Sequence, residues 1–245
     1  MTAYSCCAVI PVYNHEDALR ATVEEVLAYL PVILVDDGCN EKCKQVIRDL
    51  AQGNERIILV THAANRGKGA AVKSGMRAAL KAGYSHALQI DADGQHEPKD
   101  ISRFISYSQK QPAALIAGQP DYDDSIPRGR HYGRYLTHIW IWINTLSFTI
   151  KDSMCGFRVY PLKQSVSLLD SCRMGDRMDF DPEFIVRWYW AGHEIVQLRT
   201  PVTYPADGVS HFLPWRDNKL ISLMHAKLFF GMLLRLPRLL MHKRP

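Results

Sequence analysis

Short apolar runs alternate with amphipathic stretches through the first part of the chain. The runs contain almost no polar side chains, which is typical of strands buried on both faces of a parallel sheet. They lie at residues 6–12, 32–35, 57–60 and 87–90. Between them apolar residues recur at helical spacing, and we expect helices over 15–30, 42–52 and 69–82. This alternation predicts an α/β fold, with a mostly parallel sheet and helices on both faces.

The second half of the chain has a less regular pattern. Polar residues rich in Asp and Arg over 120–130 predict a loop, and an aromatic, apolar stretch over 132–150 predicts a helix. Another helix is expected over 182–191, where Pro182 stands at an early helical position. Apolar segments indicate further strands at residues 114–117, 157–160 and 196–204.

The C-terminal segment combines basic and apolar side chains. Residues 216–245 hold a single acid, Asp217, among these basic residues: Arg216, Lys219, Lys227, Arg235, Arg238, Lys243 and Arg244. Leucine-rich spacing over 220–240 fits an amphipathic helix at a membrane surface, and Pro237 is expected to break it. A core helix or a dimer helix is the competing interpretation. No run of about 18 uncharged apolar residues occurs, so we do not expect a membrane span.

Composition narrows the class of protein. The 245 residues are 47% hydrophobic and 22% charged, which is ordinary for a globular protein, and a net charge of +5 does not argue for nucleic acid. The six cysteines form no CxxC pair, so we expect free thiols in a reducing cytosol. The N-terminus has no basic segment followed by an apolar one, which argues against a signal peptide. These features predict a cytoplasmic protein.

Polar side chains follow three of the predicted strands at the points where they end. Tyr13 and Asn14 follow the first strand, Asp36 follows the second, and Asp91 and Asp93 follow the fourth. Ligands of open α/β sheets collect beyond the carboxyl ends of the strands. Two carboxylates at a buried strand end need a partner, and a hard divalent ion such as Mg²⁺ or Mn²⁺ is the simplest one.

Several short motifs follow one another along the chain. They are Ile10-Pro-Val-Tyr-Asn14, Val35-Asp-Asp-Gly38, Asn65-Arg-Gly-Lys-Gly-Ala-Ala71, Asp91-Ala-Asp-Gly-Gln-His-Glu-Pro98, Asp152 with Cys155-Gly-Phe-Arg158, and Phe180-Asp-Pro-Glu183 followed by Gly192. In this ordered set the chain resembles glycosyltransferase family 2, most closely its polyprenyl-phosphate (dolichyl-phosphate mannosyltransferase-like) branch. The resemblance covers roughly residues 5–205 and implies a GT-A fold with a Rossmann-like sheet.

The resemblance implies a site for a nucleoside-diphosphate sugar and for Mg²⁺ or Mn²⁺. The metal would neutralise charge on the leaving diphosphate. Asp93, Gln95 and Asp91 are the implied metal ligands, and Asp93, Asp181 and Arg158 the implied catalytic residues. The implied nucleotide-sugar-binding residues are Pro11, Tyr13, Asn14, Asp36, Gly67, Lys68, Asp91 and Ala92.

Some of these side chains also have ordinary structural explanations. Asn14 suits a turn because Asn tolerates a positive φ, and Asp37 either binds ligand or caps a turn. Lys68 reaches either the diphosphate or the Asp cluster. Asp181 lies at a helix start, where carboxylates are stabilised; its functional interpretation is a general base, which a lipid phosphate acceptor does not require.

Arginines are expected to hold the acceptor, because the planar guanidinium binds phosphate oxygens bidentately. The candidates are Arg128, Arg130 and Arg134, together with Arg158 from the Cys-Gly-Phe-Arg motif. The polyprenyl-phosphate branch usually has Gly-Ser-Arg after the fifth strand. This chain has Gly118-Gln119-Pro120 there, so a lipid hydroxyl stays open as the acceptor.

These observations predict a metal-dependent inverting glycosyltransferase that moves a sugar from a nucleoside-diphosphate sugar to a lipid-linked acceptor, polyprenyl phosphate or another lipid. Residues 1–98 are expected to bind the donor and 99–215 the acceptor, within one GT-A domain over 1–215. The segment 216–245 is expected to contact the cytoplasmic face of the membrane peripherally. A homodimer is a further possibility. The alternatives are a non-catalytic nucleotide-sugar or lipid-binding module and, less favoured, a sugar nucleotidyltransferase.

Overall fold

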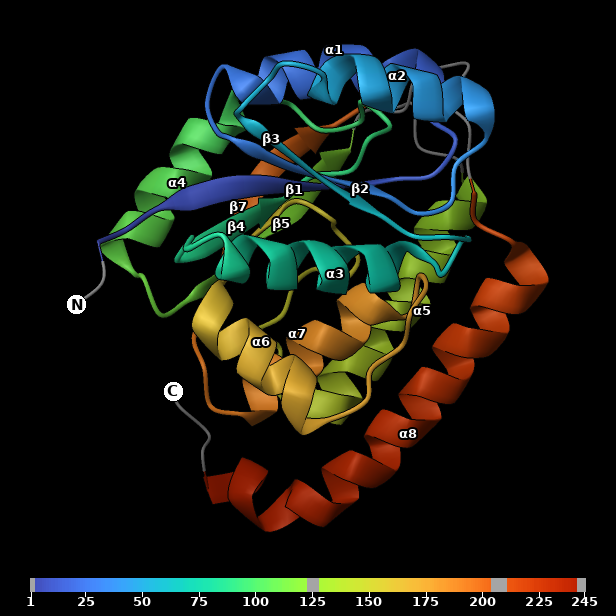
Figure 1. Cartoon of the computed structure of the whole chain (residues 1–245). Coiled ribbons are helices and arrows are strands. Elements are labelled where there is room, and N and C mark those ends of the chain that lie inside the picture. Colours follow the sequence, from blue (N-terminus) through green and yellow to red (C-terminus); the bar gives the residue numbers. More distant parts are fainter. Residues whose placement is uncertain (1–2, 123–127, 204–210, 242–245) are drawn as a thin grey trace.

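A seven-stranded sheet forms the centre of the molecule (Figure 1). The computed structural model describes residues 3–122, 128–203 and 211–241, with the backbone alone for 122 and 128–133. The strands are β1 (Cys6–Val12), β2 (Val32–Asp36), β3 (Ile57–Thr61), β4 (His86–Gln89), β5 (Leu115–Tyr122), β6 (Arg158–Pro161) and β7 (Ile195–Val202). Their order is β3-β2-β1-β4-β6-β5-β7, and β6 runs antiparallel to β4 and β5 while the other pairs are parallel. The predicted mostly parallel sheet is confirmed.

Helices cover both faces of this sheet. They are α1 (Glu16–Leu27), α2 (Glu41–Ala51), α3 (Lys68–Lys81), α4 (Asp100–Lys110), α5 (Arg128–Thr145), α6 (Leu162–Ser171), α7 (Phe180–Trp190) and α8 (Pro214–Met241). One apolar core lies between the sheet and α1, α2 and α4, and the other between the sheet and α3, α5, α6 and α7. Figure 1 shows α8 outside α5 and α7, at the lower edge of the molecule.

We did not predict α4 or α6 from the sequence. Both are amphipathic, with Ile101 and Phe104 buried in α4 and Leu162, Val166 and Leu169 buried in α6, so the helical period is present there and our prediction overlooked it. The strand β5 is also longer than expected, because it pairs with β7 up to Tyr122 opposite Val202. Pro120 is tolerated there because β5 pairs with β6 only at Ile116 and Ala117, so no ladder bond is lost on that side.

Pro237 lies inside α8, so the expectation that it breaks the helix is wrong. A proline inside a helix removes one hydrogen bond and pushes against the carbonyl four residues earlier, which bends a helix more often than it ends one. Figure 1 shows α8 changing direction near its C-terminal end.

The small residues of α3 let this helix approach the sheet closely. A side-chain carbon added at Gly75 would stand 2.3 Å from Cγ1 of Val9 in β1. Real carbon atoms do not approach to that distance, so glycine is required where the helix crosses the strand. The first residue of α3, Lys68, is thereby held at the edge where β1, β2 and β4 end.

Candidate active site at the carboxyl edge of the sheet

Lys68 joins two carboxylates that are far apart in the sequence. Its Nζ lies 2.8 Å from Oδ2 of Asp91, which follows β4, and 3.2 Å from Oδ2 of Asp181 in the first turn of α7. Burial alone would lower the pKa of Lys68, but Asp181 and Asp91 outweigh it and raise that pKa. The lysine is therefore charged. Of its two predicted roles, pairing with the Asp cluster is the one that the structure shows.

The two carboxylates of the Asp91-Ala92-Asp93 motif lie in different electrostatic surroundings. Burial favours the neutral form of Asp91, but Lys68 outweighs it and lowers the pKa of this carboxyl. Burial and the nearby charge of Asp91 raise the pKa of Asp93, whose Oδ1 accepts the N–H of Gln95 at 3.1 Å. Ala92 is only 2% exposed and packs in the core beneath the motif. A cation bound here would therefore gain most from Asp93.

The residues at this corner fit a divalent ion that shares its coordination with a substrate. Among the described residues, no group of three or more His, Cys, Asp or Glu side chains is placed to hold a metal by itself. Oδ1 of Asp91 is nevertheless buried without a hydrogen-bond partner. Mg²⁺ is commonly held by one or two carboxylates while substrate phosphates and water supply its remaining ligands. Asp91, Asp93 and Gln95 suit that arrangement.

A buried polar chain stands behind Asp181. Nε2 of Gln89 lies 3.4 Å from Oδ1 of Asp181, and the hydroxyl of Tyr160 donates to Oε1 of Gln89 at 2.8 Å. Arg158 donates to the backbone oxygens of Asp181 at 2.9 Å, Cys155 at 2.8 Å and Ser153 at 2.6 Å. These contacts fix the position of the Asp181 carboxylate.

Arg158 itself is 0% exposed. Its guanidinium has no surface on which to bind an acceptor phosphate, so its position does not support the expected catalytic or acceptor role. It is a positioning residue that ties the segment before β6 to the start of α7. Sequence reasoning recognised the motif but did not foresee where its arginine lies, because burial of an arginine cannot be read from the motif.

The glycine of the same motif lies directly against the charged cluster. A side-chain carbon added at Gly156 would stand 2.5 Å from Oδ2 of Asp91 and 2.8 Å from Nζ of Lys68. Any larger residue would therefore displace the ion pair. Two residues of the Cys155-Gly-Phe-Arg158 segment therefore shape the site. Gly156 leaves space for the Asp91–Lys68 pair, and Arg158 fixes the backbone of the segments around it.

The two acidic residues at the end of β2 make separate contacts. Asp36 is 3% exposed, and its Oδ1 accepts the N–H of Cys39 at 2.8 Å, closing the turn. Asp37 accepts the backbone N–H groups of Arg66 at 2.9 Å and Gly67 at 2.8 Å, and lies 2.6 Å from Nδ1 of His62. Of the two roles left open for Asp37, a structural one is observed: it holds the glycine-rich loop.

The end of β1 forms the other wall of the site. The last residue of β1 that pairs with β4 is Val9, so Pro11 lies beyond that ladder and costs no hydrogen bond. Asn14 has a φ of 51°, as its turn interpretation predicts, and accepts the N–H of Asn40 at 2.7 Å. The ring of Tyr13 lies 5.1 Å from that of His211.

Sequence reasoning missed His211. Its ring lies 4.7 Å from the ring of His15, and its Nε2 is buried without a partner. Burial and His211 lower the pKa of His15. An isolated histidine in an irregular segment carries no pattern, so only the folded chain reveals that it faces the end of β1.

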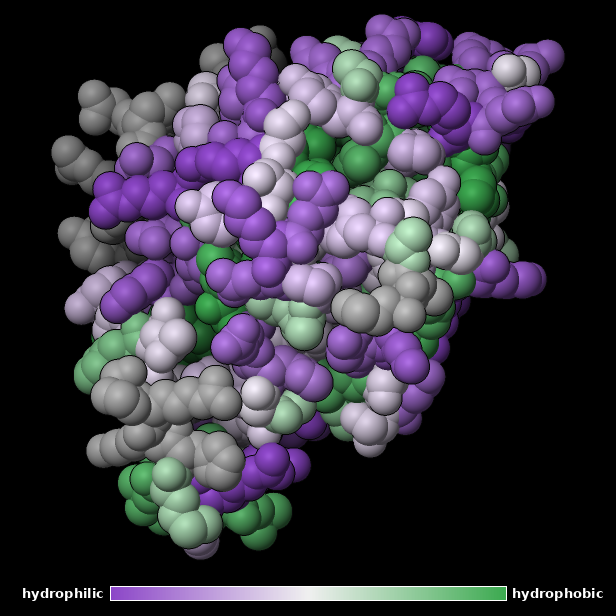
Figure 2. Space-filling view, turned by 90° about the vertical axis from the view of Figure 1, so that its left-hand side faces the viewer, coloured by the Kyte–Doolittle hydropathy of each residue, from purple (hydrophilic) through white to green (hydrophobic). Residues whose placement is uncertain are grey.

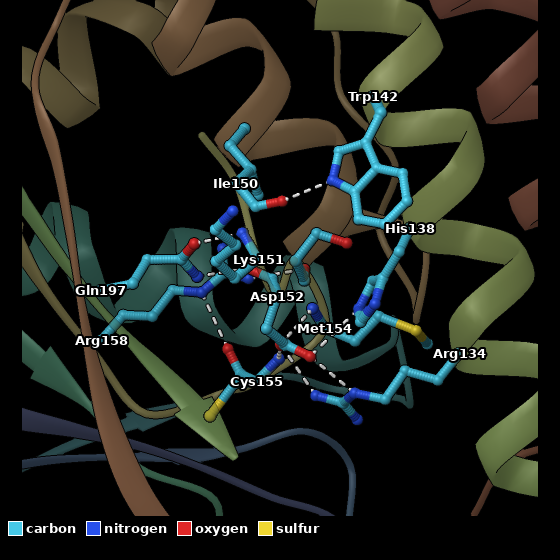
Figure 3. A network of polar contacts seen from close by, with 11 residues as sticks. Arg134, His138, Trp142, Ile150, Lys151, Asp152, Met154, Cys155, Arg158 and Gln197 are labelled. Atoms are coloured by element: carbon cyan, nitrogen blue, oxygen red, sulfur yellow. Dashed lines mark hydrogen bonds and ion pairs between the residues drawn. The ribbon is translucent and has the colours of Figure 1, made fainter. Parts of the chain in front are cut away.

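A second polar cluster joins α5 to the segment before β6 (Figure 3). Asp152 is 3% exposed, and its carboxylate accepts hydrogen bonds from Nε of Arg134 at 2.6 Å and from Nη2 of Arg134 at 2.8 Å. Nε2 of His138 lies 3.2 Å from Oδ2 of the same carboxylate. The N–H groups of Met154 and Cys155 donate to the same carboxylate. Burial would raise the pKa of Asp152, but Arg134 and His138 hold it well below its usual range. The cluster thus anchors the segment before β6 to α5.

The other three predicted acceptor arginines lie on α5. Arg134 belongs to the cluster with Asp152, while Arg128 and Arg130 stand in the first turns of the helix, with side chains outside the described residues. One turn beyond His138, Trp142 donates to the backbone oxygen of Ile150 at 2.9 Å. An apolar cleft of about 380 Å³ follows, lined mainly by Ile139, Trp142, Ile143, Leu146, Phe148 and Leu240.

Comparison with known proteins identifies the family to which this chain is similar. The family model described as Glycosyl transferase family 2 matches residues 7–165. A UDP-N-acetylglucosamine–dolichyl-phosphate N-acetylglucosaminyltransferase of Methanococcus voltae is 31% identical over 171 residues, 62% of this chain and 67% of that protein. A dolichyl-phosphate beta-glucosyltransferase of Mus musculus is 27% identical over 201 residues, 72% of this chain and 60% of that protein. These relatives agree with the predicted polyprenyl-phosphate branch.

A solved structure supports the fold. Glucosyl-3-phosphoglycerate synthase from Mycobacterium tuberculosis, in complex with Mn²⁺, UDP-glucose and phosphoglyceric acid, superposes with a TM-score of 0.68 at 14% identity, covering 94% of this chain and 80% of that one. This likeness confirms the GT-A fold. Because the family model matches well over half of the residues, the chain belongs to glycosyl transferase family 2 and is a glycosyltransferase.

Proposed function

We propose that this glycosyltransferase moves a sugar from a nucleoside-diphosphate sugar to a lipid phosphate, with inversion and with the help of Mg²⁺ or Mn²⁺. The observation that carries the proposal is the charged corner of Lys68, Asp91 and Asp181 beside Asp93. Lys68 comes from 1–98 and Asp181 from 99–215, which supports a division into donor and acceptor halves that meet at this corner.

The donor half is suited to a diphosphate leaving group. Asp91, Asp93 and Gln95 would hold the metal, which when bound withdraws negative charge from the departing diphosphate. Lys68 adds a fixed positive charge beside them. Tyr13 and Asn14 end β1 at the same edge, where a nucleoside would lie.

The state of Asp181 argues for an acceptor that needs no base. Its carboxylate is paired with Lys68 at 3.2 Å and buried to 4% exposure, so it is poorly placed to take a proton from a hydroxyl. A phosphate oxygen is already anionic and attacks without deprotonation. We therefore assign Asp181 to the positioning of Lys68, and this favours a lipid phosphate over a lipid hydroxyl.

The acceptor half offers a place for both ends of such a lipid. Along α5, Arg134 and His138 are followed one turn later by Trp142 and the apolar cleft. A phosphate beside Arg134 would leave the hydrocarbon chain over the cleft. The relatives named for dolichyl phosphate support this class of acceptor.

Membrane contact through α8 completes the proposal. By length and composition α8 is apolar enough to cross a membrane, yet Ile221, Met224 and Leu228 on one side are buried against the protein. Phe230 and Leu234 on other turns are 66% and 84% exposed. Figure 2 shows hydrophobic side chains gathered at the lower end of the molecule, at the level of the last turns of α8. We propose that α8 lies in the membrane surface, on the cytoplasmic side.

Transfer assays on vesicles test the central claim. Purified protein is supplied with UDP- or GDP-sugars, polyprenyl phosphate in vesicles, and Mn²⁺ or Mg²⁺. We expect a glycolipid product that disappears with EDTA and falls at least a hundredfold in Asp93→Ala. Asp49→Ala, which changes an exposed acid on α2, is the matched control. Donor binding without transfer to any lipid would favour the binding-module alternative, and transfer that persists in EDTA would refute the metal.

A further inference from the structure

A second cleft lies on the outer side of α3, away from the corner that holds Asp91. Its volume is about 270 Å³, and its polar lining comes from Arg66, Lys73, Ser74, Arg77, Arg173 and Asp176. These residues belong to three segments: the glycine-rich loop, α3, and the loop between α6 and α7. None of the functions assigned above uses this cleft.

Lys73 holds the cleft together. Its Nζ donates to the backbone oxygens of Met174 at 3.1 Å and Gly175 at 2.9 Å and pairs with Asp176 at 2.6 Å. These contacts fasten the loop between α6 and α7 to α3. Two segments that line the cleft, α3 and the loop between α6 and α7, are therefore held in fixed positions.

Positive charge in the cleft is not fully neutralised. Asp176 pairs with Lys73, and Asp170 pairs with Arg77 at 2.7 Å. The side chains of Arg66 and Arg173, which are exposed, have no ion pair or hydrogen bond with any residue that the structure describes. Two guanidinium groups without partners in the lining of one cleft favour an anion with several oxygens, because each guanidinium binds such oxygens in pairs.

A buried hydrogen-bond chain links this cleft to the active site. Ser74, at the cleft, has its Oγ 2.9 Å from Nε2 of His62, and Nδ1 of His62 lies 2.6 Å from Oδ1 of Asp37. Asp37 in turn accepts the N–H groups of Arg66 and Gly67, the two residues before Lys68. The chain therefore runs from the cleft to the loop that positions Lys68.

The residue types in this chain are those of a hydrolytic triad, but the surroundings exclude that chemistry here. Ser74 lies within α3, and the backbone N–H groups around it are engaged in the helix. Acyl transfer needs free N–H donors beside the nucleophile to stabilise an oxyanion. A relay of hydrogen bonds is the arrangement that the geometry supports.

We propose that the cleft is a binding site for a phosphate-bearing ligand, a phosphate or diphosphate group, and that the Ser74–His62–Asp37 chain couples its occupancy to the glycine-rich loop. An anion between Arg66 and Arg173 would draw Arg66 toward the cleft and accept from Ser74. Both changes would alter the hydrogen bonds that hold the glycine-rich loop before Lys68. The binding rests on the cleft alone, whereas the effect on catalysis rests on the proposed function.

Binding is measured first, without activity and without divalent metal. Calorimetric titration with inorganic pyrophosphate is compared between the wild type, the pair Arg66→Gln with Arg173→Gln, and the control pair Arg20→Gln with Arg48→Gln on the opposite face. We expect the first pair to weaken binding at least tenfold and the control pair to change it less than twofold. Absent binding in the wild type, or equal binding in all three proteins, would overturn the site.

Vesicle sedimentation distinguishes a free phosphate from a lipid headgroup. Vesicles of phosphatidylcholine with phosphatidic acid are the probe, and added pyrophosphate is the competitor. Because α8 is itself proposed to bind vesicles, Phe230→Ser and Leu234→Ser are present in every protein compared here. In this background a lipid ligand predicts that Arg66→Gln with Arg173→Gln removes the remaining sedimentation and that pyrophosphate competes with vesicles when both arginines are present. A soluble ligand predicts unchanged sedimentation with the calorimetric loss retained. Either result supports the anion site and shows whether its ligand is a lipid headgroup or a soluble phosphate.

Coupling is then tested with the relay. In the wild type, pyrophosphate at a concentration that saturates the cleft should change the KM for the sugar donor at least threefold, with a smaller change in kcat. Ser74→Ala should abolish this response, and Ser74→Thr, which keeps a hydroxyl, should retain it. A response that survives in Ser74→Ala would refute the relay while leaving the binding site and the proposed transferase intact.

Discussion

At the scale of single residues, one lysine decides the charge of the candidate site. Lys68 separates the carboxylates of Asp91 and Asp181 and is packed so tightly that Gly156 has no room for a side chain. Removing one partner from such a buried set leaves the others uncompensated. Stability and activity should therefore fail together at this residue.

Lys68→Met tests this coupling. It leaves the carboxylates of Asp91 and Asp181 buried without their cation, and we expect the free energy of unfolding to fall by about 3 kcal/mol, with transfer lost. Urea unfolding and the vesicle assay measure the two effects. Lys42→Met, at a lysine with 69% side-chain exposure, should leave both unchanged. If Lys68→Met were inactive but as stable as the wild type, the ion pair would not contribute to the free energy of unfolding.

Gly156→Ala tests the packing against the ion pair. The added methyl group must displace Asp91 or Lys68, so we expect kcat/KM to fall at least tenfold and stability to fall by about 1–3 kcal/mol. Gly53→Ala is the control, since Gly53 has a φ of +70° but nothing within 4 Å. It should cost about 1 kcal/mol without a change in activity. Normal activity in Gly156→Ala would mean that the pair moves freely.

Some of these residue roles could be predicted from the sequence, namely those that depend on residue type or charge alone. The positive φ of Asn14 follows from residue type, and the pairing of Lys68 with acids follows from charge. The burial of Arg158 and the contacts of Asp37 with His62 depend on how distant segments pack. Such tertiary contacts leave no period and no spacing in the chain.

At the scale of elements, the contact between α5 and α8 contains a buried histidine. His225 is 4% exposed, and its Nδ1 lies 3.4 Å from Nδ2 of Asn144. Burial lowers the pKa of His225 to about 4. The helix pair is therefore arranged for a neutral imidazole.

This histidine predicts how stability depends on pH. The unfolded chain binds a proton at His225 near pH 6.5, whereas the folded chain does so only near pH 4, so acid favours unfolding across that interval. The contribution of His225 is fully present above about pH 6.5 and is lost as the pH falls towards 4, by up to about 3 kcal/mol. Urea unfolding at pH 7 and pH 5 measures it.

His225→Gln keeps a polar side chain in place but cannot titrate. The loss of stability between pH 7 and pH 5 should be smaller in this variant than in the wild type by about 1–2 kcal/mol. Identical losses in both proteins would assign the acid sensitivity to other groups.

Element prediction succeeded where burial is repetitive. The strands β1, β2 and β3 and the helices α1, α2 and α3 carry clear apolar periods, and they form close to the expected residues. The helices α4 and α6 were not predicted, although their buried residues also recur at helical spacing. The direction of β6 could not be predicted, because an antiparallel strand between parallel ones has the same apolar pattern as they do.

At the scale of the whole molecule, apolar surface is concentrated along α5 and α8. Exposed aromatic and leucine side chains stand on both helices, including Leu136 and Trp140 on α5 and Phe230 and Leu234 on α8. The proposed contact of α8 with a membrane requires an exposed apolar surface of this kind. Truncation of α8 would also remove buried core contacts, so point substitutions are the cleaner test.

Membrane contact predicts a selective loss of vesicle binding. Phe230→Ser with Leu234→Ser removes exposed apolar area from α8, and we expect vesicle affinity to fall at least tenfold with an unchanged melting temperature. Leu80→Ser, at a leucine of similar kind on α3 that is 37% exposed, is the control. Equal sedimentation of all three proteins would exclude α8 as the contact.

The reversed direction of β6 has a consequence for how such enzymes diversify. Because β6 begins beside the end of β4, with Arg158 opposite Gln89, the segment that enters it reaches the same edge as the Asp91 motif. Residues 146–149, which precede the contacts of Ile150, Asp152 and Gly156, can therefore be lengthened or exchanged without altering the strands that would seat the nucleotide. One scaffold can in this way acquire new recipients for its sugar while its donor chemistry is inherited unchanged.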